Sequence, residues 1–289
     1  MNGEKSQINW FPGHMTKAKR KISEQISLVD AVAEVVDARI PVSSRNPDVA
    51  ELTGKKPHII LLNKCDMADE KSTLDWISFY KDAGITAIAV DSKSGKGISE
   101  FKKSVMTTLA SRLESYKEKG MGGKMLRVMV VGIPNVGKSS FINRLAGKSK
   151  ARVENRPGVT RGNQWFSVDD KLELLDTPGV LWPKFESQTV GEHLAITGAV
   201  TDRILDTELM AIRLLEILKE RYLPLVQARY GIDCLPEDSF DALCAIGRKR
   251  GMVVRGGEVD TLRAANMLLE EFRNSKIGRI TLEGTDFIA

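Results

Sequence analysis

Short apolar segments separated by polar turns run through the first two thirds of the chain. Four of them, at 58–62, 87–90, 126–131 and 172–175, have the length and apolar character of buried parallel strands. A longer segment, 98–116, has helical spacing, with apolar side chains at Phe101, Val105, Met106, Leu109 and Leu113. Strands and helices mixed in this way predict an α/β fold with a mostly parallel sheet.

The pattern changes after about residue 190, where strand-like segments give way to helical ones. The segment 205–218 is amphipathic, and 240–246 and 259–272 are typical of further helices. We therefore expect a small all-helical domain with its own core. The predicted organisation is an N-terminal basic segment (1–25), an α/β domain (26–185) and a helical domain (190–289).

A phosphate-binding loop is predicted at 132–139, where the sequence GIPNVGKS follows a strand and opens a helix at about Ser140. Glycines let backbone N–H groups surround phosphate oxygens, and the helix N-terminus favours negative charge. Lys138 would neutralise the β- and γ-phosphates, and the Ser139 hydroxyl would bind Mg²⁺. The predicted phosphate-binding residues here are Gly132, Pro134, Asn135, Val136, Gly137, Lys138, Ser139 and Ser140.

A guanine-recognition motif is predicted at 63–66, where NKCD follows the apolar segment 58–62. The carboxylate of Asp66 can accept hydrogen bonds from guanine N1–H and N2–H₂, whereas adenine offers no matching pair of donors. Lys64 would lie along the base, and Asn63 would brace the neighbouring loops. An ATP-dependent kinase built on the same phosphate loop is therefore disfavoured.

Weaker elements of the same site follow two other predicted strands. Asp91, Ser92 and Lys93 begin a loop after 87–90 that is similar to the loop whose backbone meets guanine O6. Thr160 is the only threonine between the phosphate loop and Asp176, which makes it the expected switch ligand of Mg²⁺. Asp176 would hold Mg²⁺ through water, and the Gly179 N–H would contact the γ-phosphate.

The order of these motifs is unusual. The guanine motif precedes the phosphate loop by about 70 residues, whereas in most GTPases it follows. The cyclic order is preserved, so the chain resembles a circularly permuted P-loop GTPase. The sequence GMGG at 120–123 could be the flexible join between two formerly free termini, or an ordinary loop.

Charge and cysteine content agree with a nucleic-acid partner and a reducing compartment. The net charge of +5 and pI of about 9.0 permit RNA binding without requiring it. The three cysteines lack the spacing of a disulfide framework or metal site, and no segment predicts a signal peptide or membrane span. We expect a cytoplasmic monomer without membrane association.

Basic residues gather in three clusters along the chain. They are Lys17, Lys19, Arg20 and Lys21; Lys148, Lys150, Arg152, Arg156 and Arg161; and Arg248, Lys249, Arg250 and Arg255.

Three further motifs carry a resemblance to a known family. The sequences NWFPGHM at 9–15, VDARIP at 36–41 and GRITLE at 278–283, with the permuted order, resemble bacterial ribosome biogenesis GTPase A. The resemblance extends from about residue 8 onward. It implies a GTPase that converts GTP to GDP, assists late maturation of the large ribosomal subunit and is stimulated by that particle. The three basic clusters, for their part, suit contacts with the phosphates of its rRNA.

The group that would orient the attacking water is not evident. Many GTPases have a glutamine after this Asp-x-x-Gly motif, but this chain has Val180. His14 is one candidate, because the family resemblance assigns the histidine of this motif to catalysis; it could equally cap or pack in the turn at 12–13. The other candidate is K⁺ bound by Asn135, as in similar GTPases. A non-enzymatic RNA-binding assembly factor that only senses GTP against GDP is the alternative function.

Overall fold

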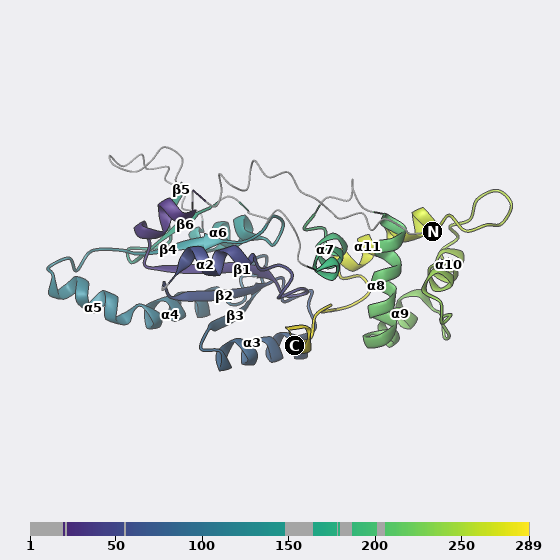
Figure 1. The fold of residues 1–289 in the computed structure, drawn as a ribbon, viewed down its shortest axis with the longest axis horizontal. Coiled ribbons are helices and arrows are strands. Elements are labelled where there is room, and N and C mark those ends of the chain that lie inside the picture. Colours follow the sequence, from purple (N-terminus) through teal and green to yellow (C-terminus); the bar gives the residue numbers. More distant parts are fainter. Residues whose placement is uncertain are drawn as a thin grey trace.

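The computed structural model describes residues 20, 22–54, 56–147, 164–177, 179, 187–200 and 206–288. Its centre is a six-stranded sheet in the order β3-β2-β1-β4-β6-β5 (Figure 1). All neighbouring strands are parallel except β5, which runs antiparallel to β6 at the edge. The strands are β1 (Ala31–Asp37), β2 (His58–Asn63), β3 (Thr86–Val90), β4 (Leu126–Val131), β5 (Gln164–Ser167) and β6 (Leu172–Asp176).

Both faces of the sheet are covered, which explains why its strands are apolar throughout. Alternate residues of a strand point to opposite faces. In β1, Ala33 and Val35 therefore join a core cluster with Phe101 and Phe141, whereas Val36 packs in a cluster with Trp76. The covering helices are α4 (Ile98–Thr108), α5 (Ala110–Glu118) and α6 (Lys138–Ala146) on the first face, and α2 (Pro47–Thr53) and α3 (Glu70–Asp82) on the second.

Helices alone form the second part of the molecule within residues 187–200 and 206–273, beside the sheet (Figure 1). They are α7 (Gln188–Ile196), α8 (Thr207–Arg221), α9 (Leu223–Tyr230), α10 (Ser239–Lys249) and α11 (Thr261–Arg273). The side chains of Asp206, Asp238 and Asp260 cap the first turns of α8, α10 and α11, where free backbone N–H groups need acceptors. The helices bury leucines and Phe272 in the cluster that also covers the first face of the sheet, so the two parts share one core.

The chain returns to the sheet after α11. Residues 278–283, which we call the strap, run from the helical part back to the loops that follow β1 and β2, and a short 3-10 helix (Thr285–Ile288) then contacts α3 (Figure 1). Ile280, Thr281, Leu282 and Glu283 are all buried. Residues 280–283 of the strap therefore belong to the interior between the two parts, whereas Arg279 lies at the surface.

The structure confirms the predicted fold class and the four predicted strands. The predicted helix at 98–116 is instead two helices that meet at Leu109, whose backbone leaves the helical region at the junction. Its apolar positions are nevertheless on the core side, with Phe101, Val105 and Leu109 buried. Within the described ranges, no helix combines the length and apolar character that a membrane crossing needs.

Candidate nucleotide-binding site

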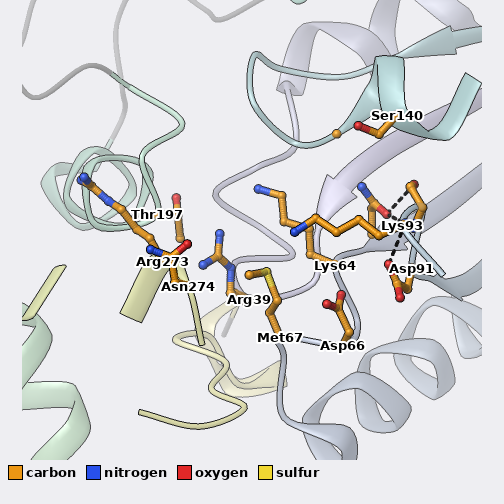
Figure 2. Close-up of a pocket in the computed structure, with 13 residues that line it drawn as sticks. Arg39, Lys64, Asp66, Met67, Asp91, Lys93, Ser140, Thr197, Arg273 and Asn274 are labelled. Carbon is orange, nitrogen blue, oxygen red and sulfur yellow. Dashed lines mark hydrogen bonds between the residues drawn. The ribbon is translucent and has the colours of Figure 1, made fainter. Parts of the chain in front are cut away.

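The predicted site residues meet at one edge of the sheet. Because β1, β2, β3, β4 and β6 are parallel, their carboxyl ends lie together, and ligands bind at this edge in open α/β sheets. A pocket of about 220 Å³ opens here (Figure 2). Its lining residues are Arg39, Asn63, Lys64, Asp66, Met67, Asp91, Ser92, Lys93, Gly137, Ser140, Thr197, Arg273 and Asn274.

Asn63 joins three loops of this pocket. Its side-chain nitrogen donates to the carbonyl oxygen of Val136 in the phosphate loop at 2.7 Å. Its side-chain oxygen accepts from the backbone N–H and the hydroxyl of Ser92, at 3.2 and 2.7 Å. A Cβ at Gly137 would lie 2.3 Å from the Asn63 amide, and Gly137 has a φ of +96°, so only glycine fits there. Asn63 thus braces the loops, as predicted.

Lys64 and Asp66 differ sharply in how they are held. The Lys64 ammonium donates to the Asn135 carbonyl oxygen and to the Asp37 carboxylate, both at 2.8 Å. The Asp66 side chain is exposed at the pocket, and no donor among the described residues hydrogen-bonds to its carboxylate. The Lys64 ammonium is thus fixed from two sides, whereas the Asp66 carboxylate keeps acceptor sites that no described donor occupies.

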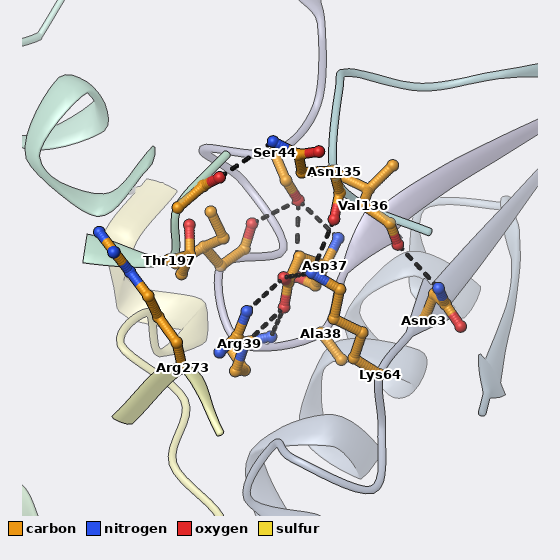
Figure 3. Close-up of polar contacts among 12 residues, drawn as sticks. Asp37, Ala38, Arg39, Ser44, Asn63, Lys64, Asn135, Val136, Thr197 and Arg273 are labelled. Atoms are coloured by element: carbon orange, nitrogen blue, oxygen red, sulfur yellow. Dashed lines mark hydrogen bonds and ion pairs between the residues drawn. The ribbon is translucent and has the colours of Figure 1, made fainter. Parts of the chain in front are cut away.

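Asp37 and Arg39 form a buried charge cluster beneath Lys64 (Figure 3). Arg39 donates to both oxygens of Asp37, at 3.0 and 2.8 Å, and its guanidinium lies over the Phe272 ring at 5.2 Å. Burial alone would raise the pKa of Asp37, but the charges of Arg39 and Lys64 hold it well below its usual value. The cluster keeps Asp37 ionised and fixes the Lys64 ammonium.

The loop after β3 is ordered by its own aspartate. The carboxylate of Asp91 accepts from the backbone N–H groups of Lys93 and Ser94, at 2.8 and 3.2 Å. Burial opposes ionisation, but the Ser94 side chain and these backbone hydrogen bonds together lower the pKa of Asp91. Asp91 therefore shapes the loop, while Ser92 and the exposed Lys93 line the pocket with it.

The phosphate loop brings Lys138 to Asp176. Lys138 is only 9% exposed, and its ammonium makes an ion pair with the Asp176 carboxylate. Thr177 beside it donates to the Val130 carbonyl oxygen at 2.8 Å, which fixes the end of β6 against β4. A Cβ at Gly179 would approach the Pro134 backbone nitrogen to 3.1 Å, so Gly179 lies directly against the phosphate loop.

The remaining predicted residues are distributed around these groups. Ser139 and Ser140 are exposed in the first turn of α6, and Gly132 directly follows β4. Ser140 reaches the pocket, whereas Ser139 does not line it. His14, Thr160 and Val180 lie outside the described residues.

The helical part supplies one wall that sequence reasoning did not predict. Thr197, Arg273 and Asn274 face Lys64 and Asp66 across the pocket (Figure 2). Arg273 donates to the Ile196 and Ala195 carbonyl oxygens at the end of α7, at 2.9 and 2.7 Å. These residues belong to no motif. Arg39 was within a motif that carried the family resemblance, but no spacing rule assigned it to the pocket.

The comparisons with known proteins agree with this geometry. The family described as "50S ribosome-binding GTPase" matches residues 127–223. Ribosome biogenesis GTPase A of Priestia megaterium is 47% identical, with 96% of each chain covered. The protein of that name from Thermotoga maritima is 35% identical, covering 96% of this chain and 94% of its own.

Solved structures show the same arrangement of elements. GDP-bound TM YlqF aligns with a TM-score of 0.67 and 31% identity, covering 92% of this chain and 100% of the other. GNP-bound YlqF from T. maritima aligns with a TM-score of 0.62 and 31% identity, covering 93% and 98%. The fold is that of a circularly permuted P-loop GTPase followed by helices. By sequence and structure, the chain belongs to the ribosome biogenesis GTPase A family.

Proposed function

We propose that this protein binds guanine nucleotides, hydrolyses GTP with Mg²⁺, and assists assembly of the large ribosomal subunit in contact with rRNA. The observation that carries the proposal is the bridge from Asn63 to Val136, because it joins the base-reading motif to the phosphate loop across 73 residues of sequence. The names of the relatives, ribosome biogenesis GTPase A and, in mouse, mitochondrial ribosome-associated GTPase 1, support the ribosomal part.

Guanine recognition is assigned to the wall formed by Asp66, Lys64 and the loop after β3. The Asp66 carboxylate accepts from guanine N1–H and N2–H₂, the Lys64 stem lies along one face of the base, and the Ser92–Lys93 backbone faces O6. Lys64 is held from two sides by Asp37 and Asn135, so the base meets a surface that needs little rearrangement. Preorganisation of this kind lowers the entropic cost of binding.

The phosphates and Mg²⁺ are assigned to the start of α6. The residues fit the metal, because the exposed Ser139 hydroxyl and the Asp176 carboxylate are oxygen ligands of the kind that Mg²⁺ prefers. Mg²⁺ bound there, with Thr160 as a further ligand, would neutralise charge on the β- and γ-phosphate oxygens. Lys138, now paired with Asp176, exchanges that carboxylate for phosphate oxygens, and the Gly179 N–H contacts the γ-phosphate.

Hydrolysis requires a group that orients water, since Val180 cannot. We assign this role to His14, with K⁺ at Asn135 supplying positive charge beside the phosphates. The carbonyl oxygen of Asn135 holds Lys64, and its side-chain nitrogen donates to Gly198 at 3.1 Å. Its side-chain oxygen is then the atom that faces a cation.

Contact with rRNA is assigned to basic clusters, including the one at the end of α10. Arg248, Lys249, Arg250 and Arg255 are all exposed. The first three lie in or directly after the last turn of α10, so they form one patch on the helical part. Exposed cations gathered in one patch suit recognition of the phosphate backbone.

The deciding experiment measures GTP turnover by the full chain, with and without large ribosomal subunits, in K⁺ and in Na⁺. We expect slow intrinsic hydrolysis, faster hydrolysis in K⁺ and a further increase with subunits. Lys138→Ala, which removes the phosphate counter-charge, is the inactive control. Nucleotide binding without turnover under every condition would show a GTP sensor instead of an enzyme, and no guanine nucleotide binding would refute the site itself.

A further inference from the structure

The strap holds the backbone of the base-reading loop, residues 64–69 between β2 and α3, from outside the pocket. The Arg279 guanidinium donates to the carbonyl oxygens of Ala68 and Cys65, at 2.8 and 3.0 Å. The Ile280 N–H donates to the Met67 carbonyl oxygen at 3.0 Å. Three carbonyl groups on either side of Asp66 are thus fixed by two consecutive residues that lie more than 210 positions later in the chain.

The same strap fixes the loop that follows Asp37, the last residue of β1, and that carries Arg39. The Leu282 N–H donates to the Arg39 carbonyl oxygen at 2.8 Å. The Glu283 carboxylate accepts from the backbone N–H groups of Val42 and Ser43, at 2.7 and 3.2 Å. Since Asp37 holds the Lys64 ammonium, the strap controls the position of Lys64 as well as that of Asp66.

Thr281 lies between these two sets of contacts. Its hydroxyl oxygen accepts from the Asp69 N–H at 3.1 Å, at the end of the base-reading loop, and its side chain is completely buried. The hydroxyl also faces the Ala38 carbonyl oxygen at 3.5 Å. One side chain therefore touches both loops.

The base-reading loop needs such support because it has little regular structure of its own. Lys64 has a φ of +61°, a conformation that non-glycine residues seldom adopt, and residues 64–69 lie between β2 and α3. No described donor holds the Asp66 carboxylate. The direction of that carboxylate therefore depends on the backbone on either side, which the strap holds.

We propose that Arg279 is a positioning residue for guanine selectivity, acting through the backbone of the base-reading loop. The proposal rests on the assignment of Asp66 to guanine given above. With the strap in place, the Asp66 carboxylate stands where it can accept from both N1–H and N2–H₂. Without the Arg279 contacts, the loop samples directions in which one of these hydrogen bonds is lost.

The test compares the dissociation constants of GDP and inosine diphosphate, because hypoxanthine is guanine without the 2-amino group. In the full-length Arg279→Ala variant we expect the preference for GDP over inosine diphosphate to fall roughly five- to tenfold, the effect of weakening one hydrogen bond. Arg279→Lys, which can still donate to one carbonyl, should retain part of the preference. Calorimetric titration measures both constants.

Two further variants separate positioning from folding. Glu70→Gln removes the ion pair of Arg279 with Glu70, 3.2 Å long, but leaves the carbonyl contacts, so its preference should equal that of the wild type. Thr281→Val removes the hydroxyl that holds the Asp69 N–H, with little change of shape, and should also lower the preference. If Arg279→Ala does not fold, Arg279→Lys decides the matter, because it loses one of the two carbonyl contacts and keeps the positive charge.

Other outcomes would contradict either the positioning role of Arg279 or the guanine assignment on which it rests. Equal losses of affinity for both nucleotides in Arg279→Ala, or a wild-type preference in both folded variants, would overturn the positioning role. A wild-type protein that does not distinguish the two nucleotides would instead refute the guanine assignment of Asp66.

Discussion

The side-chain amide of Asn135 donates a hydrogen bond of 3.1 Å to the Gly198 carbonyl oxygen. Asn135 lies in the phosphate loop, and Gly198 follows α7, so this bond joins the nucleotide site directly to the helical part (Figure 3). The donor nitrogen is fixed by this contact, and the remaining side-chain oxygen is oriented as an acceptor. The helical part thereby contacts the side chain of a residue in the phosphate loop.

The first prediction follows from this orientation. Asn135→Ala removes the oxygen assigned to K⁺, so the ratio of hydrolysis rates in K⁺ and in Na⁺ should fall to about one. Asn135→Asp keeps an oxygen but loses the donor to Gly198, and it should retain part of the K⁺ effect. Rates in matched KCl and NaCl buffers provide the measurement. An unchanged ratio in Asn135→Ala would place K⁺ elsewhere.

Replacing the base-reading carboxylate should change which nucleotide binds. Asp66→Asn presents an amide that donates where the carboxylate accepted, so GTP affinity should fall at least about tenfold. Xanthosine triphosphate, whose 2-oxo group accepts from the amide, should bind the variant better than GTP. Competition against a fluorescent nucleotide measures both affinities. Unchanged GTP affinity would exclude Asp66 from guanine recognition.

The buried charge cluster should be costly to break. Asp37→Asn leaves Arg39 buried without its counter-ion, which should destabilise the protein by about 3–5 kcal/mol. The melting temperature should fall by roughly 6–20 °C. Glu216→Gln, which breaks the exposed pair of Glu216 with Arg213, should have little effect and serves as the control.

The difference in stability between the wild type and Asp37→Asn should depend on pH in a defined way. The pKa of Asp37 is lowered in the folded protein, so its stabilisation is complete above the pKa of an unfolded aspartate, about 3.9. That stabilisation is lost progressively as the pH falls below this value towards the lower folded pKa. The stability difference between wild type and Asp37→Asn should therefore be constant from about pH 5 to 8 and narrow below about pH 4. A difference that disappears near neutral pH would contradict the ion pair.

Salt should weaken binding to large ribosomal subunits. Each phosphate contact releases counter-ions, so the logarithm of the affinity should fall linearly with the logarithm of salt concentration. Neutralising Arg248, Lys249 and Arg255 together should flatten this slope and leave GDP affinity unchanged. Neutralising Lys17, Lys19, Arg20 and Lys21 tests the N-terminal cluster in the same way. A cluster whose loss leaves the slope intact does not contact rRNA.

His14 should affect turnover more than binding. His14→Ala should lower the subunit-stimulated kcat by roughly 10²–10⁴-fold, as expected for a lost group that positions or activates water. GTP affinity should change little, because the residue lies outside the nucleotide motifs. If only the KM for subunits rises, His14 is a docking residue.

Sequence patterns predicted the parts of the site whose residues are adjacent in the chain. The strand before Asn63 and the strand before Gly132 are apolar runs, and each ends in a contiguous motif whose residue types follow from its ligand. The helical wall could not be predicted, because Thr197 and Arg273 reach the pocket only through the packing of α7 and α11. The role of the strap could not be predicted either. The hydrogen bond from Ile280 to Met67 joins two backbone groups, which almost any residue type could supply.

The strap also determines when, during biosynthesis, the contacts to the base-reading loop can form. The ribosome makes residues 63–68 long before residues 278–283, and Glu283 reaches its partner Val42 across a separation of 241 residues. Closing so long a loop is slow compared with pairing neighbouring elements. A nascent chain that has already formed its sheet therefore lacks the contacts that shape the base-reading loop. If the strap has the role proposed above, an unfinished chain that lacks residues 278–283 should prefer guanine nucleotides less strongly than the full chain does.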